Sequence, residues 1–403
     1  MNWDEFPASP PPPRPAHIEA TPFALPDALA IPRRAYLLGK WLQRGEISSI
    51  IAPGGTGKTT FEVALALSIA TGRDIFNKGL HEGAARVWLW NLEDDRIELS
   101  RQLSAAASLH GLESNDLGDR LYVDGLDQSL CSAIETVNGA QLVMPVFDGV
   151  ASEIERRSID VLMIDPFVSS HAVNENDNGA IDAIVKTWKR VAQQTRCAIV
   201  LVHHTRKTSG QAVTSEDARG ASALGSAARV VLTLNSMREE DGNRFGVADP
   251  IERRTIIRVD TGKINRAPPE SAFWFKIHSV ELANGDYVGA AARWNAPDPF
   301  ESLSAADLYA VQMAIDAGDW LADAQAETWA GKAVANVLGL NVDHDPDKAR
   351  IKSLIHTWTV SGALAKETRR CKIKGRDRPF LTVGRWINPA DLPTAKGGVG
   401  NGG

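Results

Sequence analysis

Short apolar runs alternate with longer stretches of helical periodicity along the first three quarters of the chain. The apolar runs include residues 46–52 (EISSIIA), 85–93 (ARVWLWNLE), 161–165 (VLMID) and 197–204 (CAIVLVHH). Helical stretches such as residues 60–72 (TFEVALALSIATG) separate them. Buried parallel strands are continuously apolar, and the helices that connect them cover both faces of the sheet. The pattern therefore predicts an α/β fold with a mostly parallel sheet over residues 29–295.

The pattern changes between residues 250 and 294. Segments 254–260 (RTIIRVD) and 272–278 (AFWFKIH) are rich in β-branched and aromatic residues. Such segments favour strands, and we expect them to pair antiparallel at one edge of the sheet. The prolines of residues 294–304 (WNAPDPFESLS) indicate a linker, which we assign to residues 296–302.

A second domain is expected over residues 303–390. Three segments have helical patterns, residues 303–318, 328–340 and 345–362. Two strand-like segments follow, ALAKETRRC (363–371) and PFLTVGRW (379–386), joined by the basic turn KIKGRDR (372–378). Three helices followed by a β-hairpin predict a winged helix-turn-helix domain.

Both ends of the chain have compositions that oppose regular structure. Residues 1–28 are rich in proline, with Pro10 to Pro13 in succession, and proline disrupts both helices and strand ladders. We expect a disordered, extended arm there and a flexible, glycine-rich tail over residues 391–403.

The composition is typical of a cytoplasmic protein. With 403 residues and 43% hydrophobic content, the chain can bury a large core, yet no stretch reaches the ~18 apolar residues of a membrane span. Cys131, Cys197 and Cys371 lie far apart and form no C-x-x-C pair, so they predict neither a disulfide framework nor a zinc site. We therefore expect a cytoplasmic protein without membrane contact.

Residues 50–60 (IIAPGGTGKTT) match the phosphate-binding pattern G-x-x-x-x-G-K-[ST], except that Ala52 replaces the first glycine. The glycines allow a tight turn whose backbone N–H groups face phosphate oxygens at a helix N-terminus. A glycine-rich turn without a ligand is the alternative, but the strand before the loop and the helix after it favour a nucleotide site for ATP and Mg²⁺. The expected nucleotide-binding residues of the loop are Gly54, Gly55, Thr56, Gly57, Lys58, Thr59 and Thr60.

Two acidic residues follow predicted strands and complete this candidate site. Asp165 ends the segment VLMID, where a carboxylate organises magnesium together with Thr59. Glu93 ends ARVWLWNLE and is the candidate that orients or deprotonates the attacking water. The alternatives are a turn or cap role for Asp165, and for Glu93 membership of a solvated acidic cap with the two aspartates that follow it.

Histidines and arginines raise two further questions. His203 and His204 end an apolar strand, where one imidazole can sense the γ-phosphate; a metal site is the weaker alternative because no Cys or third His lies near in sequence. Arg219 and Arg229 lie in an apolar stretch. Each is either structural or a finger that reaches a neighbouring subunit's γ-phosphate, and the residues alone do not decide.

These elements, in this order, resemble the RecA-like ATPases, and most closely the hexameric plasmid replication helicases of the RepA type and related phage and plasmid AAA-family proteins. The resemblance spans about residues 30–295 and is carried by several blocks. These are residues 32–60, NLEDD (91–95), LMIDPF (162–167), VHHTRK (202–207), RGASALGSAARVVLTL (219–234) and TGKINRAP (261–268).

The resemblance implies a role for each matching position. Lys58 and Thr59 would bind phosphate and magnesium, Asp165 would be the magnesium carboxylate, and Glu93 the catalytic carboxylate. His204 would sense the γ-phosphate, Arg229 would be the finger inserted into the next subunit, and Lys263 would lie near the nucleotide. Segments 169–179 (SSHAVNENDNG) and 207–220 (KTSGQAVTSEDARG) would face single-stranded DNA in the channel of a hexamer.

Charge is distributed unevenly along a chain whose net charge is -6. Between Lys348 and Trp386 there are 11 Lys or Arg against two acids, so this region is strongly basic. Such a region is typical of contact with a phosphate backbone, although a solvated hairpin face is the plainer alternative, and a winged helix can also bind protein. The expected DNA-binding residues are Lys348, Arg350, Lys352, Arg369, Arg370, Lys372, Lys374, Arg376 and Arg378.

Three functions compete on these grounds. The first is a ring-forming, ATP-hydrolysing DNA helicase or translocase, in which the winged helix contacts duplex DNA. The second is an ATP-switched DNA-binding regulator or recombination mediator that does not unwind DNA. A P-loop small-molecule kinase is disfavoured, because no substrate lid is evident and the two histidines have no role in such an enzyme.

Overall fold

A computed structural model of the chain describes residues 20–205, 213–214, 222–264, 272–371 and 375–387. The chain divides into two compact units, Met1–Ala35 and Tyr36–Gly403. In the first unit, the described residues include a short 3-10 helix, Ala28–Ala30, whose N-terminus is capped by the Asp27 side chain. The proline run of the predicted arm and the whole of the predicted tail, residues 391–403, lie outside the described residues.

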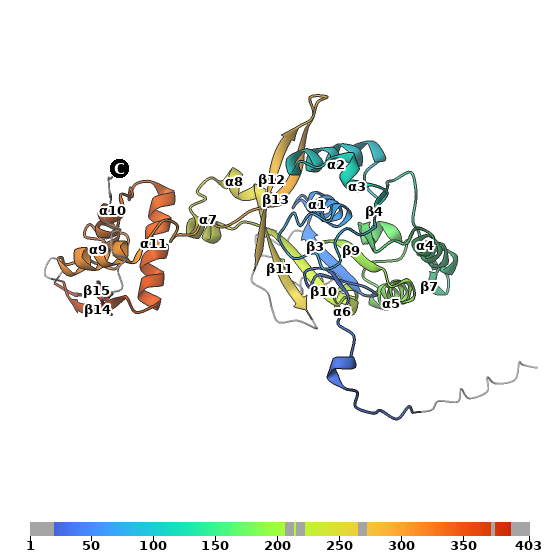
Figure 1. The fold of residues 1–403 in the computed structure, drawn as a ribbon, viewed down its shortest axis with the longest axis horizontal. Helices are drawn as coiled ribbons and strands as arrows, with labels where there is room; N and C mark the ends of the chain where they lie inside the picture. Colours follow the sequence, from blue (N-terminus) through green and yellow to red (C-terminus); the bar gives the residue numbers. More distant parts are fainter. Residues whose placement is uncertain (1–19, 206–212, 215–221, 265–271, 372–374, 388–403) are drawn as a thin grey trace, which may run out of the picture. The chain divides into compact units, whose positions relative to one another are not determined.

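The second unit contains a large central sheet (Figure 1). Its strands are β3 (Ile47–Pro53), β4 (Val87–Asn91), β5 (Leu121–Asp124), β8 (Val161–Asp165), β9 (Ala198–Thr205), β10 (Val230–Ser236), β11 (Ile256–Ile264), β12 (Phe273–Glu281) and β13 (Tyr287–Arg293). The strand order is β13-β12-β11-β10-β3-β9-β8-β4-β5. All neighbours from β10 to β5 are parallel, whereas β10 to β13 pair antiparallel. The structure thus confirms the mostly parallel sheet and its antiparallel edge.

The connections between these strands are mostly helical, as βαβ units require. The helices are α1 (Lys58–Thr71), α2 (Arg96–His110), α3 (Ser114–Leu117), α4 (Met144–Arg157), η2 (Phe167–Ser170), α5 (Asn178–Thr195), α6 (Ser222–Ala227), α7 (Glu239–Phe245) and α8 (Pro250–Thr255). Two small antiparallel pairs accompany them, β1 (Tyr36–Leu38) with β2 (Leu42–Gln43), and β6 (Ala133–Thr136) with β7 (Gly139–Leu142).

The sheet is buried on both faces, which explains the continuously apolar strands. Alternate residues of β4 belong to separate cores: Val87 and Leu89 pack with α1 and α2, and Trp88 and Trp90 pack on the side of α4 and α5. Because side chains alternate along a strand, the position of a polar residue at the end of β4 decides to which face of the sheet it points. This alternation decides where the residues of the candidate site point.

The antiparallel edge of the sheet braces the start of α1. Phe61 of α1 stacks on Phe275 of β12, with ring centroids 5.0 Å apart and planes inclined by 12°. Ile277 of β12 lies against the loop before α1, so that a Cβ atom added to Gly57 would come within 2.4 Å of Ile277 Cδ1. The non-parallel strands therefore help to hold the helix that follows the glycine-rich loop.

The C-terminal part has a core of its own. Its elements are α9 (Ala305–Asp316), α10 (Ala330–Leu338), α11 (Asp345–Val360), β14 (Leu364–Arg370) and β15 (Asp377–Val383). Val311, Ile351, Leu354 and Leu381 are among the buried side chains that pack together there. Leu321 forms β-bridges with Trp329 and Phe380, which adds a third short segment to the hairpin. The three helices and the hairpin occur in the predicted order, and the winged-helix assignment stays a prediction.

None of the helices in the described segments is both long and apolar enough to cross a membrane.

Candidate nucleotide-binding site

The glycine-rich loop joins β3 to α1 at the carboxyl end of the parallel strands. Gly55 and Gly57 have φ angles of 75° and 84°, a region that residues with a Cβ atom rarely adopt. A Cβ atom at Gly54 or Gly55 would meet nothing within 4 Å, so the backbone of the loop is open to a ligand there. Thr56 closes the turn by donating its hydroxyl to the carbonyl of Pro53 at 2.8 Å.

The departure from the phosphate-loop pattern lies in the strand rather than in the turn. Ala52 belongs to β3, is fully buried and pairs with His204 of β9. Its φ is not positive, so a methyl group at this position imposes no backbone strain. Alanine in place of the first glycine is therefore compatible with a working loop.

Lys58 is the first residue of α1, and its ammonium group is held inside the loop. Its Nζ donates to the Pro53 carbonyl at 3.0 Å and lies 3.4 Å from the Ala52 carbonyl. Burial lowers the pKa of Lys58, while the negative charges of Asp165, Glu62 and Glu93 oppose that shift. A partly desolvated ammonium group at this point attracts phosphate strongly, because few water molecules screen its charge.

Thr59 and Asp165 meet as predicted, although they are 106 positions apart in the chain. The Thr59 hydroxyl donates to Asp165 Oδ2 at 2.9 Å, while Asp165 Oδ1 is buried and has no hydrogen-bond partner in the described part of the chain. Burial raises the pKa of Asp165 to about 6, against the opposing effects of Thr59 and Lys58. An unsatisfied buried carboxylate oxygen beside a hydroxyl is a suitable pair of ligands for Mg²⁺. Thr60 instead faces the antiparallel edge, near Gly289 of β13.

Asn91 is a member of this site that sequence reasoning missed. Its Nδ2 donates to Asp165 Oδ2 at 3.2 Å, and its Oδ1 accepts from the backbone N–H groups of Glu93 and Asp94 at 2.8 and 2.7 Å. Asn91 is almost fully buried at the end of β4. A single amide therefore joins Asp165, the candidate magnesium ligand, to the turn that carries Glu93, the candidate catalytic residue. A polar residue closing an apolar strand was the available signal.

Glu93 and His204 also come together. Their side chains are 3.6 Å apart between Glu93 Oε2 and His204 Nε2, and the carboxylate is about half exposed. Burial and the charge of Lys58 lower the pKa of His204, and Glu93 opposes the shift. A neutral imidazole next to a carboxylate, beside the loop that holds Lys58, fits a group that senses phosphate or orients water.

His203 is placed differently from its neighbour. It is 6% exposed, and burial, with a smaller effect of His204 and Lys58, lowers its pKa to about 4, so it is neutral at physiological pH. In the described residues no three His, Cys, Asp or Glu side chains gather into a metal site, so the metal alternative gains no support.

Glu62 is a second residue that sequence reasoning missed. It lies one turn into α1, is fully buried, and neither carboxylate oxygen has a hydrogen-bond partner among the described residues. Burial and the charge of Asp165 raise the pKa of Glu62 well above its ordinary value, whereas Lys58 lowers it. An acidic residue inside the apolar run FEVALALSIA was the signal in the sequence.

Arg229 and Lys263 lie level with the amino end of β3, whereas the phosphate loop follows its carboxyl end. The Arg229 backbone N–H donates to the carbonyl of Ile47, the first residue of β3, and Lys263 pairs with Val231 of β10. The Lys263 ammonium group donates to the carbonyls of Gly225 and Ser226 at 3.0 and 2.7 Å. Burial and the charge of Arg229 lower the pKa of Lys263. Arg219 lies outside the described residues.

The basic residues of the C-terminal part fall into two groups. Arg350 donates to the carbonyls of Pro299 and Glu301, Arg369 pairs with Asp319 at 2.6 Å, and Arg378 pairs with Asp323 at 2.5 Å. In the described residues the other group forms no ion pair, and Lys372 and Lys374 lie outside them. The members of this second group are Lys348, Lys352, Arg370 and Arg376.

This fold and this site define a P-loop nucleotide-binding protein. The strand–loop–helix unit supplies the phosphate cradle, and the neighbouring strands β8, β4 and β9 deliver Asp165, Glu93 and His204 to the same edge. Residues 12–210 match the family model of the AAA domain, so this part of the chain is a RecA-like P-loop ATPase domain. Such domains typically bind ATP with Mg²⁺, and the match implies nucleotide hydrolysis. Arg229, Lys263 and the C-terminal part lie beyond the matched residues.

Proposed function

We propose that this protein is a ring-forming, ATP-driven DNA helicase or translocase of the plasmid or phage replication type. The observation that carries the proposal is the separation of two sets of residues across one sheet. Lys58, Thr59 and Asp165 lie at the carboxyl end of the parallel strands, and Arg229 lies at the amino end. Each chain would then hold half of two different nucleotide sites.

The length of β3 supports this proposal. Six residue steps of β3 lie between Ile47, beside Arg229, and Pro53, which begins the phosphate loop. At about 3.3 Å per residue this is about 20 Å, which exceeds the reach of an arginine side chain. Arg229 is therefore too far away to serve the nucleotide of its own chain. A head-to-tail contact between identical chains, which closes into a ring, would bring it to the phosphate loop of a neighbour.

The surroundings of Arg229 favour such a role. Its Nε lies 3.4 Å from Glu46 Oε2, and Glu46 in turn forms an ion pair with Lys189. The Arg229 side chain nevertheless remains 40% exposed, so it is oriented without being enclosed. Lys263 is close enough for the charge of Arg229 to lower its pKa. We propose that the two cations act together on the γ-phosphate of the next subunit, as a finger and a supporting charge.

DNA contact is proposed for the C-terminal part, read as a winged helix. Lys352 is exposed on α11, and Arg370 and Arg376 are exposed at the two ends of the hairpin turn. These cations form no ion pair in the described part of the chain, so they are available to phosphates. Arg350 already binds carbonyl groups of the linker, and Arg369 and Arg378 bind aspartates of their own domain, which makes these three the weaker candidates.

A mixed-subunit experiment tests the composite site. We expect Lys58→Ala and Arg229→Ala chains each to lack ATP hydrolysis, with nucleotide binding retained only in Arg229→Ala. In an equal mixture, about one quarter of the interfaces combine an intact Lys58 with an intact Arg229, and hydrolysis should recover to about that fraction. Normal hydrolysis by Arg229→Ala alone, or no recovery in the mixture, contradicts the proposal.

A second candidate is an ATP-switched DNA-binding regulator that does not unwind DNA, and one observation favours it. Segment 169–179, expected to face DNA in a channel, contains no Lys or Arg, and its Ser170 and His171 are buried. Strand displacement from a forked duplex separates the candidates. ATP-dependent displacement supports the helicase, whereas DNA-stimulated hydrolysis without displacement supports the switch.

A further inference from the structure

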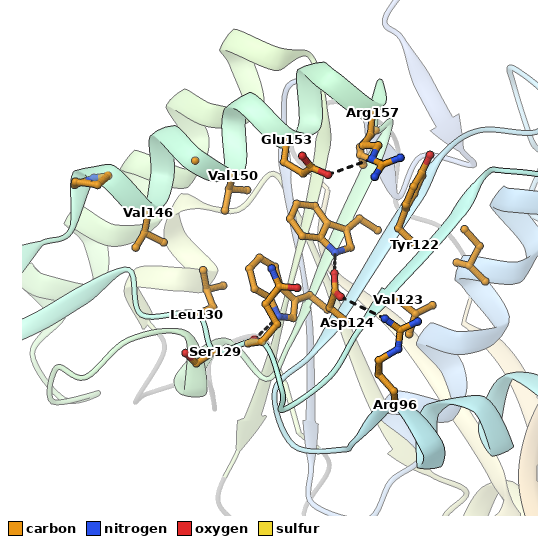
Figure 2. A pocket seen from close by; sticks show the side chains of 17 residues that line it. Arg96, Tyr122, Val123, Asp124, Ser129, Leu130, Val146, Val150, Glu153 and Arg157 are labelled. Carbon is orange, nitrogen blue, oxygen red and sulfur yellow. Dashed lines mark hydrogen bonds and ion pairs between the residues drawn. The ribbon is translucent and has the colours of Figure 1, made fainter.

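Tyr287 of β13 presents an open aromatic ring, which the tryptophans of the sheet do not. A cavity beside α4 is lined by Val146 and Val150 of that helix (Figure 2) and by Trp88 and Trp90 of β4. The two tryptophans are 5% and 4% exposed and are packed into the core. Tyr287 is 68% exposed, and its side chain has no hydrogen-bond, ion-pair or ring partner within the described residues. Single exposed aromatic residues are common, so the position of this one decides its meaning.

The direction of β12 carries the β12–β13 hairpin past the phosphate loop. β10 is parallel to β3, β11 is antiparallel to β10, and β12 is antiparallel to β11, so β12 runs in the same direction as β3. Because a Cβ atom added to Gly57 would lie 2.4 Å from Ile277 Cδ1, Ile277 is level with the loop. The residues after Ile277 therefore lie beyond the loop, at the carboxyl end of the parallel strands. Figure 1 shows this hairpin projecting beyond the rest of the sheet.

Tyr287 shares a strand face with a residue that lies against the start of α1. A Cβ atom added to Gly289 would lie 3.1 Å from Ile277 Cγ2 and 4.0 Å from Thr60 Oγ1. Side chains two residues apart on a strand point to the same face, so Tyr287 is on the face that looks toward the first turn of α1. Glu281 of β12 is paired directly with Tyr287 and is exposed as well. An aromatic ring and a carboxylate thus stand side by side beyond the loop.

The hairpin that carries these two residues is held in place by the domain. Val280 and Val288, on the opposite face of the hairpin, pack against the apolar core. Arg101 of α2 forms an ion pair of 3.0 Å with Asp286, the residue before Tyr287. A ring on a strand that is already ordered costs a ligand little conformational entropy to engage.

The phosphate site determines which end of a nucleotide would reach the hairpin. Asp165, Glu93 and His204, the groups expected at the γ-phosphate, come from β8, from the turn after β4 and from β9, all on one side of β3 in the strand order. Strands β10 to β13 lie on the other side. A nucleotide whose γ-phosphate meets the first set therefore directs its sugar and base toward β12 and β13. The four residue steps from Ile277 to Glu281 span about 13 Å, comparable to the length of an extended nucleoside diphosphate.

We propose that Tyr287 and Glu281 bind the base of the nucleotide whose phosphates the loop holds. The tyrosine ring stacks on the base, and the Glu281 carboxylate accepts a hydrogen bond from an exocyclic amino group such as that of adenine. A base that presents a carbonyl oxygen at this position, as thymine does, is disfavoured because two acceptors then face each other. The proposal rests on nucleotide binding at the phosphate loop, which the match to the AAA domain implies, and not on DNA unwinding.

Titration calorimetry of the full-length protein with ADP and with pyrophosphate, both in the presence of Mg²⁺, tests the role of the ring. ADP carries the base, whereas pyrophosphate offers the loop phosphates alone. We expect Tyr287→Ala to weaken ADP binding at least about fivefold, because it removes the stacking of one base, and to change pyrophosphate binding less than about twofold. Tyr287→Phe keeps the ring and should bind ADP like the unmodified protein.

Three results overturn the role of Tyr287 while leaving the phosphate loop intact. They are an unchanged ADP affinity in Tyr287→Ala, an equal loss of pyrophosphate binding in that variant, and an equal loss of ADP binding in Tyr287→Phe. If the unmodified protein binds neither ADP nor pyrophosphate, the loop is not a nucleotide site and the base site falls with it.

Purine riboside diphosphate, which differs from ADP only in lacking the amino group, tests Glu281. We expect the unmodified protein to bind ADP at least about fivefold more tightly than this analogue, since a hydrogen bond to a charged group is lost. Glu281→Ala should bind the two ligands alike. Glu135→Ala, at an exposed position of β6, is the matched control and should keep the preference. No preference in the unmodified protein, or a preference that survives in Glu281→Ala, overturns the assignment.

Discussion

Asn91 and Asp165 are joined by a hydrogen bond of 3.2 Å between the ends of two neighbouring parallel strands. Because the same Asn91 side chain accepts the backbone N–H groups of Glu93 and Asp94, the position of the turn that carries Glu93, the candidate catalytic residue, depends on Asp165, the candidate magnesium ligand. The two carboxylates of the site are thus positioned as one unit rather than separately. A residue that hydrogen-bonds to a metal ligand, without binding the metal itself, fixes the orientation of that ligand.

Replacement of Asn91 tests this dependence. We expect Asn91→Ala to reduce the rate of ATP hydrolysis by about 10- to 100-fold, because Asp165 loses a donor and the Glu93 turn loses its acceptor. The measurement is steady-state hydrolysis over a range of Mg²⁺ concentrations. Asn138→Ala, on an exposed turn, is the control. A rate within twofold of the unmodified protein at every Mg²⁺ concentration contradicts the role given to Asn91.

Gly57 is the loop position at which a side chain is least tolerated. It has a φ of 84°, and an added Cβ atom would lie 2.4 Å from Ile277 Cδ1. A left-handed conformation costs an alanine about 1–2 kcal/mol, and the contact adds to that cost. We therefore expect Gly57→Ala to lower the thermal unfolding midpoint and to weaken ATP binding. Gly54→Ala, whose Cβ atom meets nothing within 4 Å, should unfold like the unmodified protein; equal losses in both variants contradict this account.

The parts of the site that follow from local sequence were predicted, and the parts that depend on tertiary contacts were not. The phosphate loop and Asp165 are recognisable because a strand, a turn and a helix leave a short motif in the chain. Asn91 was missed because its role comes from contact with β8, which lies 74 positions away. From the neighbouring sequence alone, Asn91 indicates only the end of a strand.

The position of Arg229 shows what strand direction adds. The sequence left open whether this arginine is structural or acts on a neighbour. The parallel pairing of β10 with β3 puts Arg229 at the amino end of β3, away from Lys58. The antiparallel pairing of β10 with β11 puts Lys263 at that same end. The end of the sheet at which a residue lies, and the face to which it points, depend on the order and direction of the strands. The apolar pattern alone does not specify that order.

We expect the buried carboxyl group of Glu62 to make the stability of the protein depend on pH. Its pKa is raised on folding, so the unfolded chain releases this proton at a lower pH than the folded one. The contribution of Glu62 to the free energy of unfolding is therefore fully present below the pKa of the unfolded chain, about 4.3. It is lost as the pH rises toward the pKa of the folded chain. We expect Glu62→Gln to match the unmodified protein near pH 4 and to be the more stable of the two at pH 8.

Thermal or urea unfolding of both proteins between pH 4 and pH 8 measures this difference. Glu155→Gln, at an exposed position of α4, is the control and should show no comparable trend. A constant difference between Glu62→Gln and the unmodified protein across the range means that the buried carboxyl does not titrate as described.

We expect substitutions in the two groups of C-terminal cations to affect DNA binding differently. Arg370 and Arg376 are exposed and form no ion pair within the described segments, whereas Arg378 is paired with Asp323. We expect the double variant Arg370→Ala/Arg376→Ala to weaken DNA binding at least tenfold in fluorescence anisotropy. The slope of log affinity against log salt should fall by about 2, since two phosphate contacts are lost.

Charge-matched controls separate a docking surface from a general loss of positive charge. Arg190→Ala/Arg254→Ala removes two exposed cations of the α5 and α8 helices, and it should change neither the affinity nor the salt slope appreciably. Arg378→Ala should act chiefly on the stability of the hairpin, because its guanidinium group is engaged by Asp323. If the hairpin double variant and the Arg190/Arg254 variant lose affinity equally, the C-terminal cations do not form the DNA surface, and the basic hairpin is a solvated face.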